Sequence, residues 1–385
     1  ARRVILNGEP GYVNKQNLRL GRIGKDDNLR PDLAEGFNPC GEQPLESHEL
    51  CTLVETCPTK CAGYKEWLRA CEYATFYAST VTLLPTHSNI TNKVMNRNRR
   101  IGVGIIDFSG WKHTEGMHKV IKYMRLGYKK VREINKWVND EAGIPTANRV
   151  TTVKPGGTVP KVVGRTASWN RPTFKWTLRR VRISNQSKMV PLLIAAGVPY
   201  EVDIASMNTL VFEFPIVQGP AKPAEEGSVW EQAFDLTTLQ AEWSDNAVSN
   251  TIYFKPKWVL SRIVEDGQKL TLNPEYFKQL GPDHWESKST RLKGNMIYDY
   301  NPNHEEDSIE PVLSAIAPRT KSASMLPHTA KGVYAQMPEE GITEEEYHLR
   351  VSKITSIDWS LLRNEESTPD KYCSGGVCES NINAI

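Results

Sequence analysis

The chain has 385 residues, of which 39% are hydrophobic and 24% charged, so it can form one large or two ordinary packed domains. Its formal net charge of +3 gives no broad basic surface for nucleic acid or an anionic membrane, no apolar run approaches the ~20 residues that span a bilayer, and residues 1–20 lack the layout of a signal peptide. Seven cysteines are a sparse and odd set, which favours catalytic thiols in a reducing compartment, so we expect a cytoplasmic protein.

Short β-rich runs alternate along the chain with amphipathic stretches. The runs predict strands at 2–6, 101–107, 149–153, 177–183, 209–214, 250–254 and 321–326. Apolar residues at helical spacing predict helices at 48–54, 64–81, 116–141, 189–196 and 229–248. Polar segments with Pro, Gly and Asn predict loops at 219–227 and 273–303. This alternation is typical of an α/β fold with a mostly parallel sheet.

The end of the chain differs from the rest in composition. From about Ser356 the periodicity is lost and the sequence becomes polar. We therefore expect one domain over residues 1–355 and a flexible tail over residues 356–385, which carries Cys373 and Cys378. The two glycines between these cysteines permit the tight turn that a disulfide between them needs.

The most informative segment is Asn38-Pro39-Cys40-Gly41-Glu42. In an extended or hairpin-tip backbone, residues two apart point to the same side, so the amide, the thiol and the carboxylate can converge on one ligand. The negative charge of Glu42 raises the pKa of a neighbouring thiol, which makes Cys40 a poor anionic nucleophile. The pattern favours a cysteine that loses or donates a hydrogen atom while the carboxylate handles protons.

This pentad resembles the active-site loop of ribonucleotide reductases. Further segments that resemble the family, in register with it, lie at 7–11, 99–104, 152–158, 211–215, 245–249 and 321–328. The resemblance implies the C-terminal half of a ten-stranded α/β barrel with the pentad on a central finger loop. Because family members place several hundred residues before the pentad and only 37 precede it here, it also implies a complementary N-terminal half supplied in trans or by splicing.

The resemblance assigns a role to each residue of the pentad that carries chemistry. Cys40 would be the thiyl-radical cysteine that removes the 3′ hydrogen of the ribose. Glu42 would take the proton of the 3′ hydroxyl, and Asn38 would hold the intermediate by a hydrogen bond. Cys51 would be one member of the thiol pair that supplies two electrons. Its eleven-residue distance from Cys40 resembles the monomeric, adenosylcobalamin-dependent ribonucleoside-triphosphate reductases, so the cofactor expected is adenosylcobalamin.

Two other segments receive roles from the same resemblance. Cys373 and Cys378 would form the mobile redox relay that passes electrons from thioredoxin, or a similar dithiol reductant, to the spent disulfide. Pro155, Gly156, Gly157 and Thr158 would bind the phosphates of the ribonucleotide substrate, because small residues let backbone amides approach an anion. Without the family match, this Gly-Gly pair would indicate only a turn.

Three alternatives stay open at this point. The radical could come from a separate metal subunit, although such enzymes usually carry a Tyr-Tyr pair and no such dipeptide occurs here. The chain could be a noncatalytic fragment or assembly subunit, since a half-barrel exposes strand edges. It could also be a dithiol oxidoreductase or zinc protein. Cys57, Cys61 and Cys71 lack a second paired ligand set, so inert thiols are the favoured reading and we assign no metal ligands.

Overall fold

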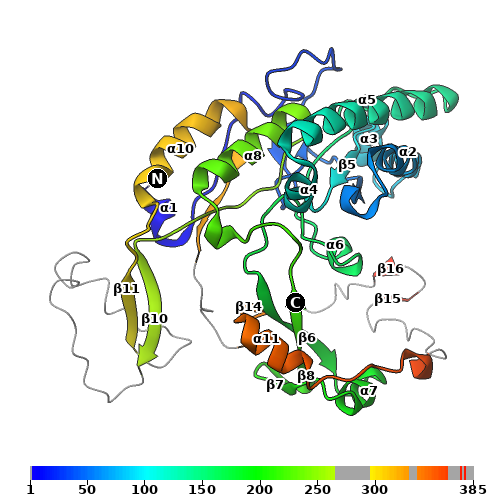
Figure 1. The fold of residues 1–385 in the computed structure, drawn as a ribbon. Coiled ribbons are helices and arrows are strands. Elements are labelled where there is room, and N and C mark those ends of the chain that lie inside the picture. The colour runs from blue at the N-terminus through cyan, green and yellow to red at the C-terminus, as the bar shows by residue number, and fades with distance from the viewer. Residues whose placement is uncertain (1, 265–294, 329–335, 363–372, 375–376, 379–385) are drawn as a thin grey trace, which may run out of the picture. The chain divides into compact units, whose positions relative to one another are not determined.

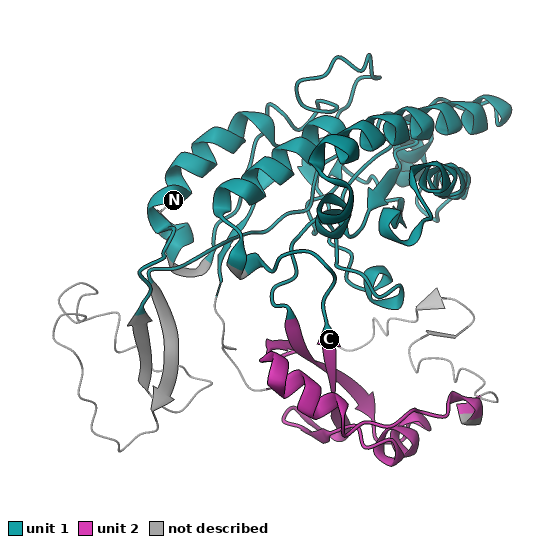
Figure 2. Cartoon of the chain, viewed as in Figure 1, with its two compact units in different colours: residues 1–175, 217–334 teal, residues 176–216, 335–385 magenta. Residues whose placement is uncertain are grey.

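The computed structural model describes residues 2–264, 295–328, 336–362, 373–374 and 377–378. By its internal contacts the chain divides into two compact units, one of residues 1–175 and 217–334 and the other of residues 176–216 and 335–385 (Figure 2). We call them the first and the second unit. Within the described ranges no helix has the length and apolar character to cross a membrane.

The first unit is built on a series of short parallel strands. β4 (Leu53–Thr56) pairs in parallel with β5 (Gly102–Ile105), and β9 (Ile252–Phe254) pairs in parallel with β13 (Met325–Pro327). Single parallel bridges link Val103 to Thr151 and Val153 to Val248, so the extended segments between these two pairs continue the series. The residues of β5 are buried on both faces, whereas β4, β9 and β13 are buried only in part.

Helices pack around these strands and complete the core. They are α2 (Tyr64–Val81), α3 (Asn89–Asn98), α4 (Phe108–Glu115), α5 (Met117–Glu141), α8 (Val229–Glu242) and α10 (Ile309–Ile316) (Figure 1). Trp67 of α2 contacts the rings of Trp111 and Trp243, with centroids 4.9 and 5.6 Å apart. A methyl group at Gly127 of α5 would lie 2.5 Å from the ring of Trp67, so glycine lets α5 approach α2 closely.

Smaller elements complete the first unit. β2 (Gly36–Phe37) and β3 (Pro44–Leu45) form a short antiparallel hairpin. The remaining elements are α1 (Arg2–Asn7), β1 (Tyr12–Val13), β12 (Ser322–Ala323), α6 (Val159–Val162), β10 (Trp258–Val264), β11 (Asn295–Tyr300) and the 3-10 turns Pro58–Lys60, Ala224–Glu226, Glu306–Ser308 and Ala317–Arg319. β1 pairs with β12 and β10 with β11, both antiparallel.

The second unit is a four-stranded sheet with helices. Its strand order is β14 (Glu339–Gly341), β6 (Trp176–Ser184), β8 (Ser206–Val217) and β7 (Tyr200–Asp203). The helical elements are α7 (Met189–Ala195), α11 (Glu344–Val351) and the 3-10 turn Trp359–Leu362. Val190 and Leu193 of α7 pack with Phe212 in a separate small core. β15 (Cys373–Ser374) pairs antiparallel with β16 (Val377–Cys378).

The α/β fold and most predicted elements are confirmed, with four differences. Residues 2–6 form the helix α1 instead of a strand, because Val4 packs into the core of the first unit and tertiary packing overrides the β propensity of the run. Residues 48–54 form no helix: His48 has a φ of +65°, and β4 begins at Leu53. The predicted helix 229–248 ends at Glu242. Most of the predicted loop 273–303 lies outside the described residues, but its end forms β11.

Candidate active site

The pentad lies at the tip of a β-hairpin. β2 (Gly36–Phe37) pairs antiparallel with β3 (Pro44–Leu45), and we call residues 36–45 the finger loop. The Asn38 N–H donates to the Gln43 carbonyl at 3.1 Å, and the Gln43 N–H donates to Oδ1 of Asn38 at 3.0 Å. Gly41 has a φ of +73°, a left-handed conformation that favours glycine. Cys40 therefore lies in the turn of the hairpin, and the side chain of Asn38 links the two strands by its hydrogen bond to Gln43.

The two chemical groups of the pentad differ in their exposure. Cys40 is exposed, whereas the side chain of Glu42 is buried and its Oε2 accepts no hydrogen bond. Partial burial and the charge of Glu42 raise the pKa of the Cys40 thiol, against the opposing charge of Lys154. At neutral pH Cys40 is therefore a neutral thiol, as the sequence predicts.

Cys51 lies in the same electrostatic environment. Partial burial, followed by the charge of Glu42, raises the pKa of its thiol to about 11, and Cys40 and Glu49 add to the shift. A hydrogen bond from Asn38 acts in the opposite direction. The structure thus brings Asn38, Cys40, Glu42 and Cys51 together as the sequence predicts, with both cysteines free.

The tip of the finger loop is fastened to the parallel strands. The Glu42 carbonyl accepts hydrogen bonds from the Ala247 N–H at 2.9 Å and from Oγ1 of Thr152 at 2.7 Å. The fully buried side chain of Gln43 lies against Gly102, where a methyl group would come within 2.7 Å of Nε2. These contacts fix the chain at Glu42 and Gln43.

The predicted phosphate loop follows the strand segment that ends at Val153. Gly156 is buried with a φ of +64°, whereas Pro155, Gly157 and Thr158 are exposed. Thr158 precedes α6, and its hydroxyl makes no capping hydrogen bond to that helix. The backbone of this loop is therefore open to a ligand on the side that Gly157 and Thr158 present.

A buried carboxylate lies beside this loop. Glu55, at the end of β4, is 3% exposed in its side chain, and its Oε2 lies 3.4 Å from Nζ of Lys154. Burial raises the pKa of Glu55; Lys154 opposes the shift and Glu42 adds to it. Sequence reasoning missed Glu55 and Lys154. The position of Lys154 directly before Pro155 was the available signal for the lysine, whereas no sequence pattern marked the glutamate.

Several buried polar atoms of this region accept or donate no hydrogen bond in the described structure. They are Oε2 of Glu42, Oε1 of Glu55, and both Oε1 and Nε2 of Gln43. Buried polar atoms without partners are rare and costly in folded proteins. Their presence beside an exposed thiol favours a site that is completed by a polar ligand.

The other cysteines fall into two groups. Cys71 is buried in α2, and Cys57 and Cys61 are half-buried and free. Among the described residues no group of His, Cys, Asp or Glu is placed to hold a metal ion. The backbones of Cys373 and Cys378 stand opposite each other in the β15–β16 pair, while their side chains lie outside what the structure describes. Their proposed relay role stays a prediction.

The comparisons with known proteins agree on one family. The chain is 31% identical over 382 residues to a Dictyostelium discoideum protein described as a "probable adenosylcobalamin-dependent ribonucleoside-triphosphate reductase", covering 97% of this chain and 44% of that protein. It is 31% identical to the adenosylcobalamin-dependent ribonucleoside-triphosphate reductase of Euglena gracilis, covering 98% of this chain and 46% of that protein. The enzyme of the same name from Lacticaseibacillus paracasei is 28% identical, with 97% of this chain and 49% of the other covered.

Solved structures give the same result. A crystal structure of a B12-dependent (class II) ribonucleotide reductase superposes with a TM-score of 0.72 at 27% identity, over 92% of this chain and 47% of the other. The alpha subunit of the Actinobacillus ureae class Id ribonucleotide reductase, with a TM-score of 0.51 and 13% identity, shares the fold. No family model matches the chain. The chain spans about half the length of the curated relatives it matches.

Proposed function

Because this chain belongs to the family of adenosylcobalamin-dependent ribonucleotide reductases, of which it spans about half a member, we propose that it carries the radical-bearing part of a ribonucleoside-triphosphate reductase site. The observation that supports this best is the finger loop. It holds an exposed neutral thiol, Cys40, beside the buried carboxylate of Glu42, and a second thiol, Cys51, in the same environment. This set suits hydrogen-atom transfer and not attack by a thiolate.

The first step belongs to Cys40. Adenosylcobalamin, when bound, would supply the one-electron radical chemistry that starts the reaction. The Cys40 thiol suits an external radical source of this kind because it is exposed at the tip of the hairpin and keeps its proton. It gives up its sulfur-bound hydrogen atom, and the resulting thiyl removes the 3′ hydrogen of the ribose.

The neighbouring groups handle protons and electrons. Glu42, with Oε2 free to accept, takes the proton of the 3′ hydroxyl as the 2′ hydroxyl leaves as water. Cys51 and a second thiol supply two electrons and two protons and become a disulfide, with one proton leaving in the water and the other hydrogen bound at the 2′ carbon. The 3′ carbon then takes a hydrogen atom back from the Cys40 thiol, which regenerates the thiyl on Cys40. Oδ1 of Asn38 is occupied by the Gln43 N–H, so its amide NH₂ is the group left to donate to the sugar.

The triphosphate would bind at Pro155, Gly156, Gly157 and Thr158. Lys154 adds the positive charge that this loop needs, because Glu55 alone would repel the anion. The Cys373/Cys378 pair would reduce the spent disulfide with electrons from thioredoxin or a similar dithiol. The partner that supplies the second thiol is the complementary N-terminal half of the enzyme. Thiols of this kind need a reducing compartment, which places the protein in the cytoplasm.

The test is reconstitution of the reaction. The chain is mixed with the missing half of a close relative, a ribonucleoside triphosphate, a dithiol and adenosylcobalamin, and deoxynucleotide is measured. We expect product only when both halves and the cofactor are present, and none with Cys40→Ser. Cys61→Ser is the matched control, since this thiol lies outside the finger loop and should be dispensable. Turnover without adenosylcobalamin would favour a separate radical-generating subunit, and full turnover by Cys40→Ser would refute the proposal.

A further inference from the structure

Both ends of the finger loop carry a buried carboxylate at matching positions. Asp32 lies four residues before β2, and Glu49 lies four residues after β3. Both side chains are completely buried. Each is also held locally: Oδ1 of Asp32 accepts the Ala34 N–H at 3.1 Å, and Oε2 of Glu49 accepts the Glu46 N–H at 2.9 Å. Each carboxylate is therefore held close to one end of the hairpin, Asp32 before β2 and Glu49 after β3.

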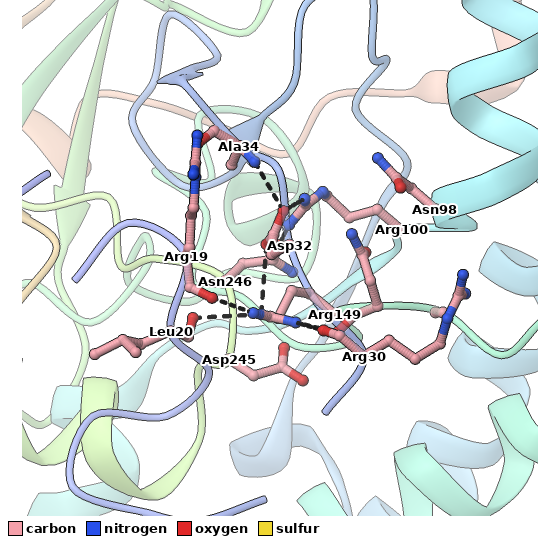
Figure 3. Close-up of polar contacts among 12 residues, drawn as sticks. Arg19, Leu20, Arg30, Asp32, Ala34, Asn98, Arg100, Arg149, Asp245 and Asn246 are labelled. Atoms are coloured by element: carbon pink, nitrogen blue, oxygen red, sulfur yellow. Dashed lines mark hydrogen bonds and ion pairs between the residues drawn. The ribbon is translucent and has the colours of Figure 1, made fainter. Parts of the chain in front are cut away.

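One guanidinium group contacts both carboxylates. Arg100, which lies just before β5, donates from Nη2 to Asp32 at 2.6 Å and from Nε to Glu49 at 2.9 Å. Its side chain is completely buried, so these ion pairs are not weakened by water. Figure 3 shows Arg100 extended toward Asp32, with Asn98 and Asn246 beside it. Because Arg100 binds the chain before and after the hairpin, it ties the two stems of the finger loop to each other.

The third contact of Arg100 leads to the tip of the loop. Nη1 donates to Oδ1 of Asn246 at 3.0 Å, and Nδ2 of Asn246 donates to the carbonyls of Ile101 and Thr151 at 2.9 and 2.8 Å. The next residue, Ala247, donates its N–H to the Glu42 carbonyl. The same guanidinium thus fixes the strand that holds the backbone of Glu42.

We propose that Arg100 is the positioning residue of the finger loop, which holds the thiol of Cys40 beside Glu42. The planar fork of arginine can reach three acceptors in fixed directions, whereas the ammonium of lysine is a single point charge and cannot reproduce all three contacts. This inference rests on the proposed function only in so far as it says that the placement of Cys40 serves catalysis. The placement of Cys40 itself can be measured on the chain without any turnover.

The experiment is site-resolved alkylation of the full chain. Wild type and Arg100→Lys are treated with iodoacetamide between pH 6 and 10, and labelling of Cys40 and Cys71 is followed by peptide mass mapping. The titratable groups that the structure places about Cys40 are Glu42, Lys154 and the thiol of Cys51. Released from partial burial and from Glu42, Cys40 should be labelled at least about threefold faster at pH 8, which corresponds to a pKa lower by half a unit.

Cys71 serves as an internal reporter of global unfolding because it is completely buried in α2. It should stay protected in Arg100→Lys. Arg125→Lys is the matched control, since Arg125 makes a comparable two-pronged contact with Glu242, at 2.6 and 2.8 Å, outside the finger loop. This control should label Cys40 at the wild-type rate.

Two further variants separate positioning from folding. Glu49→Gln keeps an oxygen for Arg100 and should keep the labelling of Cys40 near wild type, whereas Glu49→Ala should raise it. If Arg100→Lys does not fold, Asp32→Ala, which removes an acceptor of Arg100, tests the same link and should also speed the labelling of Cys40. Unchanged labelling of Cys40, or labelling of Cys40 and Cys71 in parallel, would overturn the proposal. Neither result would bear on the reductase activity, which the Cys40→Ser reconstitution tests separately.

Discussion

Gly156 and Glu55 lie in direct contact: a methyl group added to Gly156 would come within 2.9 Å of Oε1 of Glu55. Gly156 also has a φ of +64°, a conformation that residues with a Cβ rarely adopt. The neighbouring Gly157 has open space where a Cβ would lie, and its φ is not in the left-handed region. The backbone and the surroundings therefore require glycine at position 156 but not at position 157.

This difference predicts that alanine at the two positions changes the free energy of unfolding by different amounts. Gly156→Ala should cost about 1–2 kcal/mol from the left-handed backbone and displace the carboxylate of Glu55. Gly157→Ala should change stability by less than about 0.5 kcal/mol. Urea unfolding measures the stability of each variant. The KM for the triphosphate measures how well the loop binds the substrate. Equal effects of the two substitutions would contradict the contact between Gly156 and Glu55.

The environment of Cys51 predicts its pH dependence. Its pKa is raised to about 11, with burial as the first cause and the charge of Glu42 as the second. Alkylation of Cys51 should therefore be slow at pH 8 and rise up to about pH 11. Glu42→Gln removes a negative charge, so the profile should move to lower pH. Glu66→Gln, which alters an exposed glutamate of α2, is the control. A profile that Glu42→Gln leaves in place would show that Glu42 does not act on this thiol.

The sign of the linked stability effect follows from the same shift. A thiol whose pKa is raised in the folded state contributes stability that is fully present below its unfolded pKa. For Cys51 this contribution is lost as the pH rises from about 9 toward about 11. Cys51→Ser should therefore unfold with a weaker pH dependence than wild type in this alkaline range. Denaturant unfolding at pH 8 and pH 10.5 gives the comparison.

The tail cysteines should matter only for one type of reductant. In the reconstituted enzyme, Cys373→Ser with Cys378→Ser should abolish turnover driven by thioredoxin, because the relay that reaches this protein is lost. Much of the turnover with a small dithiol should remain, since a small molecule can reduce the site disulfide directly. Cys57→Ser with Cys61→Ser is the control with two thiols removed elsewhere. Equal losses with both reductants would contradict the relay.

Asp32 should dominate the acid sensitivity of the finger-loop stems. Burial alone would raise its pKa, but the charge and hydrogen bond of Arg100, together with the charge of Arg149 and the Ala34 N–H, outweigh burial and lower the pKa below its ordinary value. Its contribution is therefore present at pH 7 and is lost as the pH falls below about 4. Asp32→Asn should cost about 3–5 kcal/mol at pH 7, because it removes one of the two negative charges that compensate the buried guanidinium of Arg100.

The measurement is urea unfolding at pH 7 and pH 3.5. The deficit of Asp32→Asn relative to wild type should shrink at the lower pH, where the stabilising effect of the Asp32 charge is being lost. Asp140→Asn provides the surface comparison, since Asp140 pairs with Lys136 on the exposed face of α5 and should contribute only about 0.3–0.5 kcal/mol. A deficit for Asp32→Asn that is the same at both pH values would argue against the ion pair with Arg100.

Local patterns in the sequence were sufficient to predict the long helices. The periodicity of 64–81 and 116–141 predicted α2 and α5 almost to the residue, because each helix buries one apolar stripe along its full length. The same rules failed at 2–6 and 48–54. These segments are too short to establish a period, and Val4 is placed by packing while the positive φ of His48 interrupts a helix.

The candidate site likewise contains some residues that the sequence could predict and others that it could not. Asn38, Cys40 and Glu42 are close neighbours in the sequence, so their convergence could be predicted from the chain direction alone. Glu55, Lys154 and Arg100 could not be assigned roles, because their contacts join residues tens of positions apart.

The amino-acid sequence by itself predicted the reactive thiol, the carboxylate two residues away and the family that the chain resembles, since these predictions depend on residue type and short spacing. Only the tertiary structure decided what holds that thiol in place. Arg100 meets Asp32 and Glu49 from 68 and 51 positions away, and a buried ion pair over such distances exists only after the parallel strands have brought its partners together.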